Sequence, residues 1–173
     1  MTAFDGDDEM SVVVKLEAVL EAMDLPQEWE SFLDPETGEI VTISEDDRFA
    51  LDGEDLTGLP EWQRESVIRI RRVLDSGRGL RLPDSYDIHE WDLMRRFSTS
   101  VEDPDDRGEL LEAIHGKGAF RLFKVTIARL DLREEWFRYR DEALRRIAKD
   151  WLERHEVPFV EQGWNRGQLK SMS

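Results

Sequence analysis

One short stretch of the chain gathers the residue types best suited to binding chemistry. Residues 114–124 read IHGKGAFRLFK, with one glycine on each side of the first lysine. At 100° per residue on an α-helix, three cations of this stretch fall within about 60° of one another. These cations are Lys117, Arg121 and Lys124. Free backbone N–H groups at a helix start opened by Gly116 and Gly118 favour an anion, so we predict binding of phosphate or carboxylate there.

His115 lies at the start of this stretch, directly before Gly116, and is the candidate proton carrier if the anion site belongs to an enzyme. The stretch does not match the phosphate-binding loop G-x-x-x-x-G-K-[ST]. In the alternative interpretation, Gly116 and Gly118 only mark where helices end and begin, and the cations pair with nearby acids. The sequence leaves both interpretations open.

Other chemical motifs are missing from the sequence. It contains no cysteine, which excludes disulfides, Fe–S clusters and zinc sites built on thiolates. The three histidines, His89, His115 and His155, lack the helical spacing of a zinc-binding pair. The acidic runs do not follow the ligand spacing of a calcium loop, and no G-x-S-x-G nucleophile motif is present. We therefore predict no metal site and no cofactor, while catalysis itself stays undecided.

Charge is distributed very unevenly along the 173 residues. Residues 1–60 carry 18 acidic and two basic side chains, which accounts for the whole net charge of −16. Residues 61–173 carry 22 side chains of each sign. This balance makes nucleic acid an unlikely partner and argues against docking on anionic lipid. With no long apolar run and no signal-peptide pattern, the sequence predicts a cytoplasmic protein without a membrane partner.

The elements that must position these residues are mostly helical. Apolar residues recur at spacings of three and four, which predicts amphipathic helices. The expected helices cover about residues 13–23, 60–76, 86–97, 104–114, 118–129 and 131–155. The acidic residues 45–58, with two glycines, are expected to form a loop.

Apolar side chains on these helices are expected to form the core. Four tryptophans on helical apolar faces are assigned to core packing: Trp62, Trp91, Trp136 and Trp151. In the helix over 118–129, one stripe is expected to be buried: Phe120, Phe123, Ile127 and Leu130.

A short antiparallel hairpin is expected near the N-terminus. Residues 34–38 (DPETG) separate two apolar segments, and Asp-Pro followed by Gly is typical of a tight turn. Residues 80–83 could add an edge strand. The predicted fold class is therefore α+β, a mostly helical single domain with a small antiparallel hairpin or sheet. We expect a flexible acidic arm over residues 1–11, one compact domain over 12–157 and a loose tail over 158–173.

Several motifs resemble one bacterial family. Residues 14–17 (VKLE) followed by residues 32–40 (FLDPETGEI) are similar to the opening of uncharacterised protein family 0158. Residues 113–124, with their Gly-Lys-Gly turn, and the Trp136 helix at residues 135–141 (EWFRYRD) resemble the C-terminal signature of that family. The resemblance spans about residues 12–157. It implies a compact bacterial cytoplasmic domain and brings no established activity.

Two positions depart from that signature. Leu122 stands where the family usually has a basic residue, and Val125 stands where it usually has an acid. The departures put in doubt that every charge of the signature is needed.

Two functions follow from these observations. The first is a non-enzymatic interaction or regulatory protein, whose acidic N-terminal third engages a basic protein partner. The second is an enzyme or sensor that binds a small phosphorylated molecule at the basic helix start. The first rests on the charge of residues 1–60, and the second rests on residues 114–124.

Overall fold

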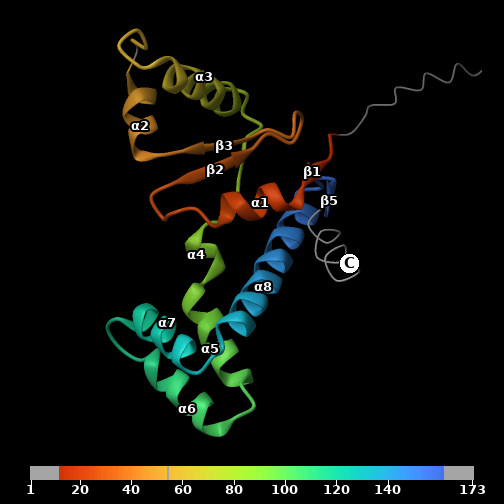
Figure 1. Ribbon diagram of the computed structural model, residues 1–173. Coiled ribbons are helices and arrows are strands. Elements are labelled where there is room, and N and C mark those ends of the chain that lie inside the picture. Colours follow the sequence, from red (N-terminus) through yellow and green to blue (C-terminus); the bar gives the residue numbers. More distant parts are fainter. Residues whose placement is uncertain (1–11, 54, 162–173) are drawn as a thin grey trace, which may run out of the picture. The chain divides into compact units, whose positions relative to one another are not determined.

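The computed structural model describes residues 12–53 and 55–161 and divides into two compact units (Figure 1). The first unit comprises Met1–Asp84 and Ala148–Ser173, and the second comprises Ser85–Ile147. Helices account for most of the described residues, which confirms the mostly helical α+β class. The expected single domain over residues 12–157 stays a prediction, and the expected acidic arm lies outside the described residues.

A three-stranded antiparallel sheet organises the first unit. Its strands are β2 (Glu30–Leu33), β3 (Ile40–Ile43) and β4 (Leu80–Arg81), in the order β3-β2-β4. Phe32 pairs with Val41 on one side and with Arg81 on the other. The hairpin and the edge strand predicted from the sequence are therefore confirmed.

Helices cover both faces of this sheet. Figure 1 shows α1 (Leu16–Met23) and α3 (Glu61–Asp75) on opposite sides of the strands. Alternation along β3 directs Val41 and Ile43 to the α3 side, where they join the buried side chains of Ile70 and Val73. Phe32 and Leu51 pack against the same cluster.

The first unit also contains a helix that the sequence analysis missed. Residues 45–58 were expected to be a loop, but α2 spans Glu45–Asp52. A capping box starts this helix, because the Ser44 hydroxyl accepts from the Asp47 N–H while the Asp47 carboxylate accepts from the Ser44 N–H. The prediction of a loop was wrong because it rested on the acidic composition of residues 45–58, whereas the Ser44-x-x-Asp47 spacing indicates the start of a helix.

The ends of the described chain meet in a two-stranded parallel pair. Strand β1 (Val14–Lys15) pairs with β5 (Phe159–Val160). The strand β5 lies at the beginning of the segment expected to be a loose tail, so that expectation does not hold for these two residues. Residues 162–173 of the expected tail lie outside the described residues.

The second unit is helical in its described residues. Its helices are α4 (Ser85–Ile88), α5 (Glu90–Ser100), α6 (Pro104–Ala113), α7 (Ala119–Arg129) and the first part of α8 (Arg133–Arg154). The single helix expected over 86–97 is broken at His89, whose φ of 54° is left-handed. The other helices of this unit are confirmed.

The expectation that four tryptophans pack in the core is half right. Trp136 and Trp151 are buried, but Trp62 and Trp91 are exposed. Trp62 lies at the second position of α3, before the helix reaches the core cluster at Ile70 and Val73. Trp91 lies near the start of α5, and its indole N–H donates to the carbonyl of Ile114 over 3.0 Å. Predicting burial from the apolar stripe of a helix therefore overestimates the burial of side chains near the helix ends.

Candidate functional site

The predicted anion site begins at a turn between α6 and α7. Gly116 and Gly118 have φ of 81° and 77°, a left-handed conformation that side chains other than glycine rarely adopt. Gly118 is the N-cap of α7, and its carbonyl accepts the first helical hydrogen bond, from Leu122 N–H, over 2.9 Å. The backbone conformation of the turn therefore favours glycine at both positions, whether or not a ligand binds there.

The structure places the predicted cations on the exposed side of this turn and helix. Lys117, Arg121 and Lys124 are exposed, and none of them has an ion pair within residues 12–53 and 55–161. Arg129, at the other end of α7, forms an ion pair with Glu109 of α6. Within the described chain, acidic side chains thus neutralise Arg129 but leave the three cations of the predicted site open.

His115 is also exposed, directly before Gly116. Its backbone N–H donates to the Glu112 carbonyl over 3.2 Å, and its ring has no hydrogen-bond partner among the described residues. The structure thus brings His115 next to the cations of the predicted site but shows no group that orients its ring for proton transfer.

One part of the predicted stripe on α7 is wrong. Phe120 was expected in the core, but 51% of its surface is exposed. The buried face of α7 consists of Ala119, Phe123 and Ile127, which follow one another at a spacing of four. Phe120 is one position from Ala119, and therefore 100° around the helix from it. The exposed part of α7 consequently presents apolar side chains between its cations.

Aromatic packing holds α7 in the second unit. The Phe123 ring lies edge-on to Trp136 of α8, with centroids 4.8 Å apart, and to Phe97 of α5, at 6.3 Å. Phe97 and Trp136 are themselves 5.4 Å apart. Edge-to-face pairs at these separations add about 0.5–1.5 kcal/mol beyond the area that they bury. The exposed cations of α7 therefore lie on a helix whose buried face is held by aromatic packing.

Two large aromatic side chains of the first unit are exposed. Phe49 of α2 is 75% exposed and Trp62 of α3 is 70% exposed. Around them in the sequence lie exposed acids: Glu45, Asp46, Asp52, Glu61 and Glu65. None of these five carboxylates forms an ion pair in the part of the chain that the structure describes. We call these seven residues the acidic-aromatic region.

Sequence reasoning included Glu45, Asp46 and Asp52 in the acidic residues 1–60, but it did not single out Glu61 or Glu65 and it missed both aromatics. Phe49 was placed in a loop and Trp62 in the core. The signal for Phe49 was the Ser44-x-x-Asp47 capping box, which makes residues 45–52 a helix whose side chains can be assigned to faces.

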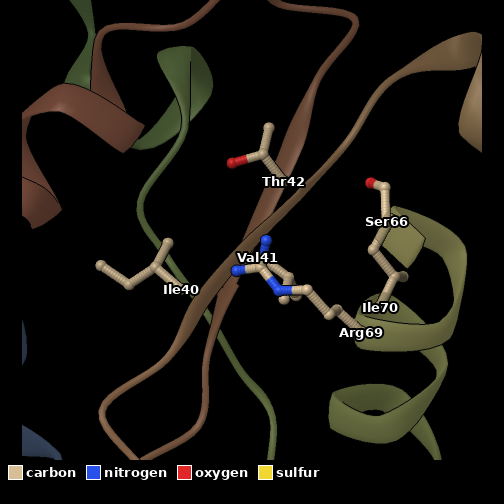
Figure 2. A pocket seen from close by; sticks show the side chains of 6 residues that line it. All are labelled: Ile40, Val41, Thr42, Ser66, Arg69 and Ile70. Atoms are coloured by element: carbon tan, nitrogen blue, oxygen red, sulfur yellow. The ribbon is translucent and has the colours of Figure 1, made fainter. Parts of the chain in front are cut away.

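A cavity lies between β3 and α3 in the first unit (Figure 2). Its volume is about 150 Å³. Three residues of β3 and three of α3 line it: Ile40, Val41, Thr42, Ser66, Arg69 and Ile70. None of the residues of the predicted anion site lies there, and the sequence analysis did not identify this cavity.

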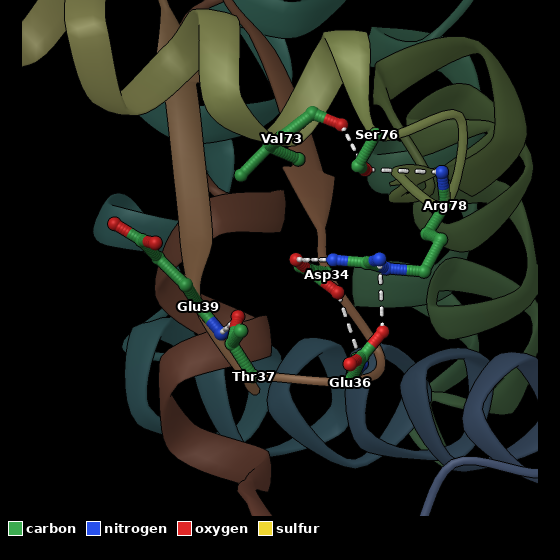
Figure 3. A network of polar contacts seen from close by, with 7 residues as sticks. All are labelled: Asp34, Glu36, Thr37, Glu39, Val73, Ser76 and Arg78. Atoms are coloured by element: carbon green, nitrogen blue, oxygen red, sulfur yellow. Dashed lines mark hydrogen bonds and ion pairs between the residues drawn. The ribbon is translucent and has the colours of Figure 1, made fainter.

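A polar network fixes the hairpin turn beside this sheet (Figure 3). Asp34 is only 3% exposed, and its carboxylate accepts from the Glu36 N–H over 2.9 Å and from the Arg78 guanidinium over 3.4 Å. The Arg78 guanidinium also pairs with Glu36 at 2.9 Å, and the backbone N–H of Arg78 donates to the Ser76 hydroxyl. Burial raises the pKa of Asp34, but these hydrogen bonds and the Arg78 charge outweigh it, so that pKa lies below its ordinary value.

The described residues offer few other sites for chemistry. They contain no group of three or more His, Asp or Glu side chains that could hold a metal ion. None of the helices in the described part of the chain combines the length and apolar character needed to cross a bilayer.

Comparison with known proteins gives a family and one curated relative. The chain matches the Uncharacterised protein family (UPF0158) over residues 10–165. A UPF0158 protein of Pseudomonas aeruginosa is 35% identical over 66 residues. That match covers 38% of this chain and 43% of the relative, so the chain spans less than half of the relative's length. No solved structure matches the chain. Because the family match extends over most of its length, the chain belongs to the uncharacterised protein family UPF0158.

Proposed function

We propose that this protein is a non-enzymatic interaction or regulatory protein whose acidic N-terminal third binds a basic protein partner. The acidic-aromatic region, which begins in the last part of that third and continues to Glu65, carries this proposal: Phe49 and Trp62 are exposed, and the exposed carboxylates beside them in the sequence have no ion pair in the described chain. Aromatic side chains of this size anchor protein interfaces when a partner buries them. Unpaired acids around such anchors favour a basic partner and speed its association.

The way α2 is held supports a surface role for its side chains. No residue of α2 is buried. Besides the capping box, the Arg71 guanidinium fixes its C-terminal end by donating to the carbonyls of Leu51 and Gly53, over 3.2 and 2.8 Å. These backbone contacts and the packing of Leu51 against the core cluster anchor this helix, and its exposed Phe49 adds little to the core of the unit. A partner that covers Phe49 would provide the burial that the fold does not.

Affinity purification from the native host tests the proposal. We compare the wild type with F49A/W62A and with the control F120A/F137A, which removes two exposed aromatics of the second unit. We expect the wild type and the control to recover the same basic protein, and F49A/W62A to lose it. Equal recovery by all three forms would contradict the proposal. Deletion of residues 1–11 separates the acidic arm from the folded region, which should retain the partner on its own.

A second function has an observation of its own. Lys117, Arg121 and Lys124 are open to solvent and lack ion pairs among the described residues, as a site for a small phosphorylated molecule requires. An enzyme or sensor would use these cations with Gly116 and Gly118, and His115 would be the proton carrier.

A thermal-shift screen with nucleotides and sugar phosphates tests this second function. A ligand at 100 times its Kd stabilises the fold by about 2.7 kcal/mol. The stabilisation should disappear in K117E/R121E and persist in the control R133E/R138E, which reverses two exposed cations of α8. If no compound shifts the wild type, or if K117E/R121E responds as the wild type does, the anion site is wrong.

A further inference from the structure

Strand β3 leaves hydrogen-bonding groups of its backbone without a strand partner. It is an edge of the sheet, with β2 on one side and no strand on the other among the described residues. The carbonyl of Glu39, just before β3, accepts a hydrogen bond of 2.8 Å from the backbone N–H of Asp34, which directly follows β2. Residues of an antiparallel strand alternate between those bonded to the neighbouring strand and those facing away from it. The backbone groups of Val41 and Ile43 therefore face β2, and those of Ile40 and Thr42 face the free edge.

The cavity of Figure 2 lies along this free edge. Helix α3 forms its other wall, with Ser66 and Arg69 one turn apart, and Figure 2 shows the Arg69 side chain extending toward β3. A volume of about 150 Å³ accommodates a group as large as a benzene ring, so one side chain of a docked segment fits there. The edge and the cavity together form a groove, which we call the β3–α3 groove.

The two edges of the sheet differ in how they are protected. Strand β4 has two residues, ends in the charged Arg81, and is followed closely by Pro83. Short length, charge and proline are the devices by which proteins prevent pairing at a sheet edge. Strand β3 has four residues, and none of them is charged or a proline. The β3 edge therefore keeps the capacity to pair that the β4 edge has lost.

The positive charge of Arg69 indicates that a peptide segment with an acidic side chain fits the β3–α3 groove. The Arg69 guanidinium is exposed and pairs with Glu39 at 2.6 Å, an exchangeable contact at the surface. The Ser66 hydroxyl has no hydrogen bond among the described residues. A carboxylate entering from the β3 side would take the place of Glu39 on Arg69 and would meet the free Ser66 hydroxyl.

We propose that the β3–α3 groove binds an extended peptide segment of another protein as an added strand, with one acidic side chain directed at Arg69. Main-chain bonds to Ile40 and Thr42 would supply affinity, and the pocket beside Ser66 and Arg69 would supply selectivity. This site goes beyond the proposed function, because it uses neither Phe49 nor the unpaired acids of the acidic-aromatic region.

Selection from a phage-displayed library of random dodecapeptides, with the full chain as bait, tests the proposal. We expect the selected peptides to share an acidic residue within an apolar, extended motif. In titrations with a labelled peptide, T42P should weaken binding at least about tenfold, because proline removes an outward N–H and leaves the backbone pairing with β2 intact, losing there only the hydrogen bond between the Thr42 and Ser31 hydroxyls. R69E should reject the acidic peptide and bind its acid-to-lysine version. The control R72E, on an exposed arginine of α3 outside the groove, should bind as the wild type does.

Amide hydrogen exchange on the wild type keeps the test independent of how well the variants fold. The amides of Ile40 and Thr42 should exchange faster than those of Val41 and Ile43 in the free protein, and should slow when the peptide is added. Failure to select any peptide, or binding that neither T42P nor R69E changes, would overturn the proposal. A dimer that T42P dissociates would overturn it too, because a second copy would then occupy the edge. F49A/W62A should leave peptide binding unchanged, which separates this result from that of the proposed function.

Discussion

Asp34 illustrates at the scale of one residue how an acid in a strongly acidic segment becomes structural. It begins the hairpin turn, is almost fully buried, and holds both the Glu36 N–H and the Arg78 guanidinium. Arg78 lies 44 positions further along the chain, so no local pattern in the sequence could identify the pair. The Asp-Pro turn signal predicted where Asp34 lies, and only the fold shows that it is buried.

Substitution of Asp34 should reveal this role through its pH dependence. Its folded pKa lies below the unfolded value, so Asp34 adds stability that is fully present above about pH 4. That stability is lost as the pH falls through the lower folded pKa. We expect D34N to lower the free energy of unfolding by about 1–3 kcal/mol at pH 7, with a smaller difference below pH 4.

Urea denaturation at several pH values measures this effect. The matched control is E36Q, which removes an exposed partner of the same Arg78 and should cost less than about 1 kcal/mol. A D34N effect that is equal at pH 7 and pH 3 would show that the charge of Asp34 contributes nothing.

Gly38 closes the same turn, and its substitution should also be costly. Its φ is 75°, and a Cβ there would lie 2.5 Å from Cγ1 of Val12. We expect G38A to destabilise the fold by at least about 1 kcal/mol, because it adds left-handed strain to a steric clash. G58A is the control, since no atom lies within 4 Å of its added Cβ. Thermal denaturation of both variants checks the prediction, and equal melting temperatures would contradict it.

At the scale of elements, periodicity predicted most helices and failed where local chemistry or long-range contacts decide. The hairpin, α1, α3, α6, α7 and α8 follow from apolar spacing and turn residues. Helix α2 depends on a capping box, and the break at His89 interrupts an otherwise continuous apolar pattern. The pattern gives one face of a helix but not the neighbours that cover it, which is why Phe120 and Trp62 were assigned to the core.

Of the two candidate binding sites, one could be predicted from the sequence and the other could not. The cations of α7 were visible because they lie close together in sequence. The β3–α3 groove was not, because it joins residues 40–42 to residues 66–70. Which edge of the sheet stays free also depends on the pairing of β2 with β4, a long-range contact that spacing cannot reveal.

The turn that follows the C-terminal end of α8 contains a residue with a strained backbone conformation. Glu156 has a φ of 55°, and the Val157 N–H donates back to the Leu152 carbonyl over 2.9 Å, as in a Schellman motif. Glycine is the residue that this position favours, so E156G should stabilise the fold by about 1 kcal/mol. E153G, within the helix, should instead destabilise it by a similar amount. Chemical denaturation distinguishes the two, and a loss of stability in E156G would contradict the assignment.

At the scale of the whole molecule, the excess negative charge should weaken the fold at low salt. The net charge of −16 resides in residues 1–60, and self-repulsion of such charge opposes the compact state. Raising NaCl from about 0.01 M to about 0.3 M screens charges beyond a few ångströms, so we expect the melting temperature to rise. A fall would show instead that ion pairs such as Arg69–Glu39 and Arg78–Asp34 dominate the electrostatics of the first unit.

The proposed function places the surface that meets a basic partner at the acidic-aromatic region. Hydrogen exchange, measured on the protein alone and in complex with the co-purified partner, locates that surface. We expect exchange to slow in α2 and in the first two turns of α3, around Phe49 and Trp62, and to stay unchanged in α7. Protection confined to α7, around Arg121 and Lys124, would contradict it and place the interface on the basic helix.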